Sequence, residues 1–299
     1  MSIEGYAGFL VRMGHQILRI GGTTWFNPSP RLFSPLPFQE EIDPSKMDWG
    51  ALFRQGCLAA RCCAPSPWGR PSYRLAIDDP TYDLARLASK SRNQTKRGLE
   101  SCTVREITFH ELATHGISLE RDTLIRQNRR VPTTLEGYWR RYFALAAETE
   151  GAIAWGAFYQ DSLAAFLIAF EMMEIVHILI VRSATAHLRF YPNNALLFQF
   201  TSEILRKGRA REVSIGVESI QKGLGTLDHF KEGLGFKKVP TRQYVTLAPF
   251  LRAALRGPVL RASAACFDLA ARSEFARKTA GLLRWYRDQL RDDAAQPNV

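Results

Sequence analysis

The chain has 299 residues, of which 46% are hydrophobic and 23% charged, and its formal net charge at pH 7 is +11. This composition excludes a disordered or low-complexity protein and allows one large domain or two of ordinary size. The positive excess favours polyanionic partners, namely tRNA, the phosphates of a coenzyme or an acidic membrane surface. Charge alone does not separate these from a basic protein without such a partner.

Cysteine and histidine usage argues against disulfides and against a bound metal. The cysteines are odd in number and show no C-x-x-C spacing, which predicts a reducing, cytoplasmic compartment. No H-E-x-x-H motif or Cys/His cluster is present, so we expect no metal site. The N-terminus lacks the long apolar run of a signal peptide. Charged residues break the most apolar region, 152–181, into strand-length pieces, which favours a buried sheet over a membrane span.

The first third of the chain reads as strands and loops. Ile17–Ile20 and Ser72–Ile77 are predicted strands, and Leu52–Ala60 fits either a helix or a strand. Four prolines predict an irregular loop over Asn27–Phe38. A helix with few apolar residues is expected over Asp83–Leu99.

The middle of the chain alternates helices and strands. After a strand at Thr103–Ile107, helices are predicted over Ser118–Arg129 and Thr134–Glu150. Ile153–Tyr159 and Leu163–Phe170 form a predicted hairpin that turns at Gln-Asp-Ser.

The pattern continues with a strand over Glu174–Arg182 and a helix over Ala195–Arg206, for which Asn193 or Asn194 is the expected N-cap. A strand ending at Val217 follows. We therefore expect a mixed α/β fold.

The segment 227–236 carries the most specific signal in the chain. Leu227, Phe230 and Leu234 recur at helical spacing and predict one buried face. Gly233 and Gly235 suit the end of that helix, where the chain turns with a positive φ. Gly-Phe and another strand pattern follow, so the segment reads as helix, turn and strand.

This strand–helix–Gly-Phe–strand ending is similar to the last third of the GNAT acyltransferase fold. The sequence Phe-Lys-x-Gly-x-Gly-Phe, beginning at Phe230, resembles the FemAB-like branch, whose members transfer aminoacyl or acyl groups onto amines. The resemblance implies a tandem GNAT-like α/β fold. A degenerate N-terminal half would span residues 1–110, a complete catalytic half 111–248, and a basic helical tail 249–299.

The resemblance implies an acyltransferase or aminoacyltransferase that uses acyl-CoA or aminoacyl-tRNA as donor and holds no permanent cofactor. The acceptor would be an amine or hydroxyl of a small molecule, peptide or glycan. The alternative is a non-catalytic GNAT-like scaffold that binds membrane or RNA through its basic tail. The tail reads as one or two amphipathic helices, which either pack on their own domain or make peripheral contact with the inner face of the membrane.

Two basic segments are candidates for binding the donor's phosphates. The glycine signature that holds coenzyme A in ordinary GNAT enzymes is absent, as it is in FemAB-like proteins, which enter the following helix through a Pro-Asn-type sequence. The candidates in this segment are Arg182, Arg189, Tyr191, Asn193 and Asn194, although the two arginines fit solvated loop positions equally well. The second segment resembles the basic helix that links the halves of FemAB-like proteins, with candidates Arg92, Lys96 and Arg97.

Lys231, in the Phe-Lys motif, is the first candidate for chemistry. A lysine in this motif is implicated at the active site of FemAB-like transferases, contacting phosphate or the reacting carbonyl, and an ammonium can serve either purpose. The competing interpretation is a surface lysine on a short helix.

The proton acceptor has four candidates, Glu174, His177, Glu218 and Tyr244. His177 has a suitable pKa range but stands among apolar strand residues, as a core histidine would. Strand alternation places Glu174 and His177 on opposite faces. Glu218 follows a central strand at its carboxyl end, where open α/β sheets bind ligands.

Overall fold

The computed structural model describes residues 3–221, 225–269 and 274–295. The chain forms two compact units, each assembled from separate segments. The first comprises Met1–Met13, Leu75–Gly216 and Gly225–Lys238, and the second comprises Gly14–Arg74, Val217–Leu224 and Val239–Val299. These units do not follow the linear boundaries expected at residues 110 and 248. The division into a degenerate and a complete half stays a prediction.

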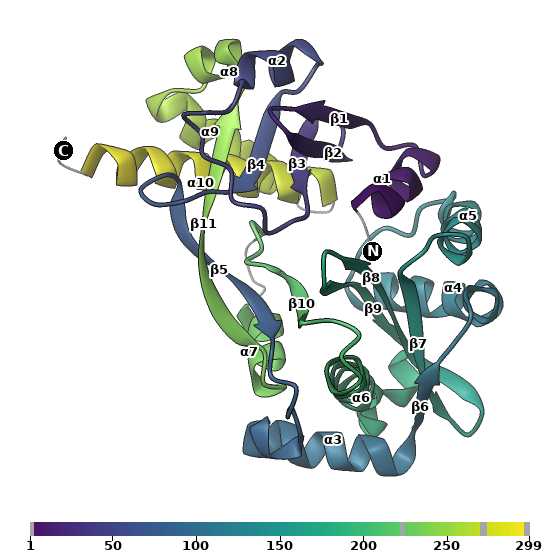
Figure 1. The fold of residues 1–299 in the computed structure, drawn as a ribbon. Coiled ribbons are helices and arrows are strands. Elements are labelled where there is room, and N and C mark those ends of the chain that lie inside the picture. Colours follow the sequence, from purple (N-terminus) through teal and green to yellow (C-terminus); the bar gives the residue numbers. More distant parts are fainter. Residues whose placement is uncertain (1–2, 222–224, 270–273, 296–299) are drawn as a thin grey trace. The chain divides into compact units, whose positions relative to one another are not determined.

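The described part of the first unit contains eight α-helical or 3-10 elements with a sheet between them. Its elements are α1 (Ile3–Arg12), η1 (Leu84–Arg86), α3 (Ser89–Ser101), β6 (Thr103–Glu106), α4 (Phe109–Arg126), α5 (Leu135–Ala147), β7 (Ala152–Tyr159), β8 (Ser162–Met172), β9 (Ile175–Ser183), η2 (Thr185–Phe190), α6 (Pro192–Arg206) and α7 (Gly225–Gly233). The strand β10 (Glu212–Val217) follows β9 in the order β10-β9-β8-β7-β6 (Figure 1). β9 and β10 run parallel, and the other pairs of this order are antiparallel.

Helices cover both faces of this sheet. Phe166 on β8 packs against the ring of Phe143 on α5, whereas Trp155 on β7 packs against Phe200 on α6. Trp155 is paired with Leu167, the neighbour of Phe166, so the two aromatic side chains point to opposite faces. α5 therefore lies on one face and α6 on the other, as Figure 1 shows.

The predicted hairpin in this unit is confirmed. β7 and β8 pair from Ala152–Phe170 to Tyr159–Ser162, and the turn between them consists of Gln160 and Asp161. Both turn residues have positive φ, 46° and 65°, which matches the two-residue turns that suit the twist of a hairpin.

The second unit contains a sheet in the order β1-β2-β3-β4-β11-β5. Its elements are β1 (Ile17–Ile20), β2 (Thr23–Ser29), β3 (Leu32–Leu36), α2 (Trp49–Arg54), β4 (Ala59–Cys63), α8 (Pro249–Ala254), α9 (Gly257–Leu269) and α10 (Glu274–Ala295), together with β5 (Arg70–Ile77) and β11 (Lys237–Leu247), which contribute residues to both units.

The two faces of β4 and β11 pack against different helices. β4 and β11 are antiparallel, with Ala59 opposite Leu247. Ala59 and Leu247 belong to a core formed with α9 and α10. Ala60 and Cys62, which point to the opposite face of β4, belong to a core that includes Leu52 of α2. The tail therefore packs on its own unit. Its three helices replace the one or two that the sequence predicted.

The proline-rich loop expected at Asn27–Phe38 is wrong, because most of it forms the β2–β3 hairpin. Trp25 and Phe33 are 0% and 1% exposed, so burial of these rings favours the strands despite the prolines. Pro35 lies opposite Trp25 of β2. The residues of β3 that pair with β4 are Leu32 and Phe33, and Pro35 comes after them. Its missing N–H therefore interrupts no bond to β4.

Two helix predictions are also corrected. The helix expected over Asp83–Leu99 is broken at Leu87, which is extended and buried, and α3 begins at Ser89. The helix expected from Ser118 begins at Phe109, because Thr108 and Glu111 form a capping box that the prediction overlooked.

The buried face predicted for Leu227, Phe230 and Leu234 is only partly confirmed. Leu234 is 0% exposed, but Leu227 is 45% exposed. Gly235 has the expected positive φ of 89°. The N–H of Phe236 donates to the carbonyl of Lys231, which closes the helix end.

Within the described residues, no helix is long and apolar enough to cross a membrane, and no group of three or more His, Cys, Asp or Glu residues is arranged to hold a metal ion. The cysteines are free thiols. Burial raises the pKa of Cys57 to about 12, so this thiol is not a reactive thiolate at neutral pH.

Candidate functional site

The central strands of the first unit diverge where Lys231 lies. β9 and β10 pair through Glu212–Ile175, Val213–Val176 and Ser214–His177. β9 continues to Ser183, so its pairing with β10 ends well before the strand does. The next residue of β10, Ile215, accepts a hydrogen bond from the Nζ of Lys231 at 3.5 Å. The ammonium therefore lies at the point of divergence.

The exposure of β9 changes at the same point. Its first four residues, through Ile178, are buried, whereas Leu179, Ile180, Val181 and Arg182 are half-buried. The pairing with β8 is also irregular between Ile168 and Ala169, which are opposite Ile180 and Ile178. A bulge changes the direction of a strand and often occurs beside a functional site.

Lys231 is oriented by its own helix. Its Nζ lies 3.3 Å from the Oδ1 of Asp228, one turn earlier on α7, and both side chains are 14% exposed. Asp228 was not among the predicted site residues, although an acidic residue three positions before a lysine is a readable sign of such a pair. The ammonium is thus neither a freely solvated surface group nor a deeply buried one.

The two predicted phosphate-binding segments meet within the first unit. The guanidinium of Arg97 on α3 lies 5.1 Å from the centre of the Tyr191 ring, which precedes α6. A Cβ on Gly98 would lie 2.7 Å from the carbonyl oxygen of Tyr191, so glycine permits this close crossing of α3 and α6. Lys96 is exposed and Arg92 half-buried on the same helix.

The start of α6 differs from the prediction. Tyr191, with φ of 55°, is the N-cap, and neither Asn193 nor Asn194 has that role. Pro192 fills the first helical position, where its missing N–H costs no hydrogen bond. The Nδ2 of Asn193 donates to the Oγ of Ser183 at 3.1 Å, and Asn194 is 5% exposed.

Arg182 and Arg189 have different surroundings. Arg182 donates through Nε to the buried carboxylate of Glu120, so its charge is already paired. Arg189 is exposed, with its guanidinium 4.8 Å from the centre of the Phe190 ring. The structure thus leaves Arg189 the more accessible of the two predicted arginines.

An unpredicted arginine supports the segment before α6. Arg126 on α4 donates to the carbonyl of Ser183 at 3.0 Å and to the Oγ1 of Thr185 at 2.9 Å. Asp122, one turn earlier, accepts from the Thr185 hydroxyl at 2.8 Å. α4 therefore holds the glycine-free segment in place.

Glu218, in the second unit, belongs to a polar network that we call the Glu218 network: Arg61, Ser72, Glu218 and Gln243. The hydroxyl of Ser72 donates to the Oε2 of Glu218 at 2.9 Å and accepts from the Nε2 of Gln243 at 2.6 Å. Arg61 donates to the Oε1 of Gln243 and, at 2.8 Å, to the carbonyl of Glu218. Each donor fixes the next group, so the Glu218 carboxylate has a defined orientation.

The guanidinium of Arg61 is held in an apolar setting. It lies 5.5 Å from the centre of the Trp285 ring on α10. Burial lowers the pKa of Arg61 to about 10, and the Glu218 carboxylate opposes this shift. Because that value is well above neutral pH, Arg61 stays charged and supplies a fixed positive field beside Glu218.

The other three predicted proton acceptors lie outside the Glu218 network. His177 is 3% exposed in the core of the first unit, paired with Ser214. Glu174 is not on its strand, since it lies with positive φ of 62° in the turn before β9. Tyr244 packs beside the rings of Trp49 and Trp68, 5.7 and 6.3 Å away between centres. The role of each as a base stays a prediction.

Sequence reasoning missed Arg61, Ser72 and Gln243. Gln243 is the neighbour of the predicted Tyr244, and strand alternation directs these two side chains to opposite faces. A single arginine within the run Ala-Ala-Arg-Cys-Cys was a visible signal, because a buried charge needs partners.

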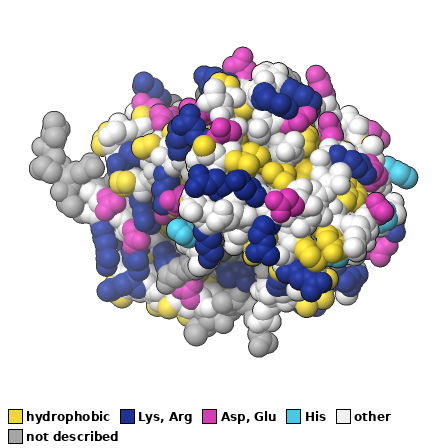
Figure 2. Space-filling view, turned by 90° about the horizontal axis from the view of Figure 1, so that it is seen from below, with side chains coloured by type: hydrophobic (Ala, Val, Ile, Leu, Met, Phe, Trp, Pro, Cys, Tyr) yellow, Lys and Arg dark blue, Asp and Glu magenta, His cyan; other side chains and the backbone are white. Residues whose placement is uncertain are grey.

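Lys and Arg side chains are spread over one face of the molecule, with Asp and Glu side chains between them (Figure 2). The positive charge is not confined to the tail, since most of the Lys and Arg residues lie before residue 249.

No protein-family model matches the chain, and no curated protein matches its sequence. Several solved structures do match its fold. FemX has a TM-score of 0.57 at 9% identity, over 84% of this chain and 93% of that chain. The C-terminal domain of a putative lysylphosphatidylglycerol synthetase from Agrobacterium fabrum has a TM-score of 0.56 at 16% identity, over 83% and 89%. L-PGS from Bacillus licheniformis has a TM-score of 0.54 at 10% identity, over 83% and 92%.

At these identities the likeness concerns the fold. It extends over both units, since more than four fifths of the chain is covered in each comparison. The mixed α/β architecture, the diverging strands and the relatives agree with the resemblance noted in the sequence. The chain shares its fold with FemX and with the lysylphosphatidylglycerol synthetase domain, and this is the mixed α/β, GNAT-like fold that the sequence resemblance implied.

Proposed function

We propose that this protein transfers an acyl or aminoacyl group to an amine or hydroxyl, and that the donor carbonyl binds where β9 and β10 diverge. The observation that carries the proposal is the position of the Lys231 ammonium, next to Ile215 at the end of the β9–β10 pairing. The half-buried stretch of β9 beyond this point supports it, because a donor needs an accessible strand edge there.

The chemistry requires a nucleophile to add to the donor carbonyl. Negative charge then develops on the carbonyl oxygen, and the bond to the leaving group breaks as the carbonyl re-forms. An oriented ammonium stabilises that developing charge or the phosphate of the donor. Asp228 holds Lys231 in place, which reduces the reorganisation needed during the reaction.

We favour aminoacyl-tRNA over acyl-CoA as the donor. The segment before α6 has no glycine, and Glu120 already pairs with Arg182. The basic residues of α3 lie beside the start of α6, where they suit a nucleic-acid backbone. The resemblance of the fold to FemX and to a lysylphosphatidylglycerol synthetase supports the same class of reaction.

Donor binding tests this proposal. We expect charged tRNA to bind more tightly than uncharged tRNA at low salt, and Lys96→Gln with Arg97→Gln to weaken both. Thermal unfolding in the presence of coenzyme A, acetyl-CoA and long-chain acyl-CoA tests whether the protein binds a CoA donor instead. Stabilisation by a CoA species alone would identify acyl-CoA as the donor. No response to any donor would favour the non-catalytic scaffold.

Glu218 is our proposed proton acceptor, on the strength of the network that orients its carboxylate. We expect Glu218→Gln to lower kcat/KM by about 100-fold, within the usual range for loss of a general base. Glu100→Gln, at an exposed position on α3, serves as the control. An unchanged kcat/KM in Glu218→Gln would exclude this role.

Peripheral membrane contact by the tail stays a prediction. Leu260, Leu282 and Leu283 of the tail are 2%, 6% and 5% exposed, so these side chains are used in packing within the second unit. Phe250, Val259 and other large apolar side chains on the tail remain exposed.

A further inference from the structure

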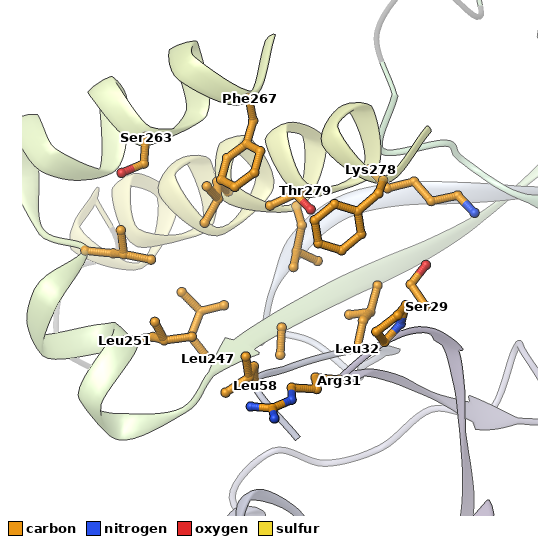
Figure 3. A pocket seen from close by; sticks show the side chains of 16 residues that line it. Ser29, Arg31, Leu32, Leu58, Leu247, Leu251, Ser263, Phe267, Lys278 and Thr279 are labelled. Atoms are coloured by element: carbon orange, nitrogen blue, oxygen red, sulfur yellow. The ribbon is translucent and has the colours of Figure 1, made fainter. Parts of the chain in front are cut away.

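An apolar cavity of about 340 Å³ lies inside the second unit, between the tail helices and the strands. Figure 3 shows leucine and phenylalanine side chains on both sides of it. Leu58 and Leu247 line it from the strand side. Leu282, Phe267 and Phe275 line it from α9 and α10. Phe275 is 53% exposed, as expected for a side chain at the opening.

The size of the cavity suits a linear hydrocarbon chain. An apolar cavity of about 150 Å³ is sufficient for benzene, so one of 340 Å³ has room for roughly ten to twelve carbon atoms. Its lining is apolar enough to exclude ordered water, because a water molecule needs several polar partners. A flexible alkyl chain fills such a space better than a polar metabolite does.

The charges around the cavity favour an anion. Among the described residues that line it there is no Asp or Glu, whereas Arg31 and Lys278 are included. Figure 3 shows the ammonium of Lys278 pointing away from the leucines and the guanidinium of Arg31 beside Leu58. A chain with a negatively charged end would therefore meet favourable charges on leaving the cavity.

A basic pocket adjoins the cavity. It has a volume of about 470 Å³ and is lined by Arg252, Arg256 and Tyr286, while Leu255 lines both spaces. Leu251 and Leu255 are directed to the apolar side, and each is followed in sequence by one of the two arginines. Two guanidinium groups and a hydroxyl can donate the hydrogen bonds that a carboxylate or phosphate accepts.

The positive charges of Arg252 and Arg256 are close enough to Tyr286 to affect its pKa. Burial raises the pKa of Tyr286, and the charges of Arg252 and Arg256 oppose that rise. Arg256 also donates through Nε to the backbone carbonyl of Arg252 at 3.3 Å, which holds the Arg256 side chain against the end of α8.

We propose that the second unit binds a single-chain anionic amphiphile, with its alkyl chain in the apolar cavity and its carboxylate or phosphate head at Arg252 and Arg256. The residues that line this site include neither Lys231 nor a member of the Glu218 network. Its existence does not depend on acyl transfer, so its test is a binding measurement.

Calorimetric titration of the full-length protein with defined probes tests the alkyl chain and the head group of the ligand separately. With hexanoate, octanoate, decanoate and dodecanoate below their micelle-forming concentrations, we expect the Kd to decrease about fourfold per added methylene. Dodecyl phosphate and dodecanoate should both bind, and their relative affinity identifies the head. Dodecanol should bind at least tenfold more weakly, and dodecyltrimethylammonium weaker still. Equal affinity for all four heads would overturn the anionic part of the proposal.

Variants locate the site. Ser263→Phe places a ring in the cavity and should abolish dodecanoate binding, whereas Ala262→Phe, exposed on the same helix, should leave it unchanged. Thr279→Met, from α10, provides a second filling variant if Ser263→Phe does not fold. Arg252→Gln with Arg256→Gln should weaken dodecanoate at least tenfold and leave dodecanol unaffected. Undiminished dodecanoate binding in a folded filling variant, or no binding by the unaltered chain, would refute the proposal.

Discussion

Replacing Lys231 by methionine is expected to lower the rate of acyl transfer about 100- to 1000-fold, the usual cost of removing one group that stabilises developing charge. Methionine keeps the length and apolar stem of the side chain but removes the charge. Among the described residues the Nζ hydrogen-bonds to Asp228 and to the Ile215 carbonyl, at the long distances of 3.3 and 3.5 Å, so the effect on stability should be small. Steady-state kinetics and thermal unfolding of the same preparation measure both effects.

Lys237→Met is the matched control for this variant. Lys237 lies beyond the Gly-Phe turn and is exposed, so its replacement should leave kcat and KM unchanged. Asp228→Asn should have a smaller effect than Lys231→Met, because it removes the group that positions the ammonium and not the ammonium itself. Full activity in Lys231→Met would remove the central residue of the proposed function.

The largest loss of stability is expected from Gly281→Ala in α10. A Cβ at this position would lie 2.2 Å from the carbonyl oxygen of Ile220 and 2.8 Å from its carbonyl carbon. Because these are backbone atoms, the helix must move to relieve the contact, and the packing of Leu282 and Leu283 moves with it. We expect a loss of about 3 kcal/mol, at the upper end of the cost of overpacking.

Gly137→Ala provides the comparison, since it makes the same substitution in a helix without the same contact. No heavy atom lies within 4 Å of a Cβ at Gly137, and the position is exposed on α5. Alanine should therefore stabilise the helix by about 0.5–1 kcal/mol through its better helix propensity. Denaturant unfolding of both variants gives the two changes. A Gly281→Ala variant as stable as the unaltered chain would show that α10 does not pack against Ile220 so closely.

Part of the site and of the fold could be predicted from the sequence because it depends on short segments of the chain. The Phe-Lys motif predicted the position of Lys231 near the end of a short helix, and α7 ends at Gly233. The hairpin of β7 and β8 followed from alternation and a two-residue turn. Glu218 was predicted at the end of a central strand, and β10 ends at Val217. Each of these depends on residues close together in the chain.

Other features could not be predicted because they depend on distant residues. Arg61 and Gln243 are 182 positions apart, and Ser72 and Glu218 are 146 apart. The register of β4 on β11 decides that Gln243 rather than Tyr244 shares a face with Arg61. The amphipathic pattern of the tail likewise predicted helices but not the strands on which they pack, nor the cavity left between them.

The sequence by itself determined the helix and strand pattern of the second half, the resemblance to the FemAB-like branch, and Lys231 as the leading residue, because periodicity and short motifs act over a few residues. The tertiary structure alone decided where β9 and β10 separate, which partners orient Glu218, and that the tail encloses an apolar cavity. The physical reason is that sheet register and side-chain packing are settled between segments far apart in the chain, where burial of Trp25 or Phe33 outweighs the local preference of a proline-rich loop.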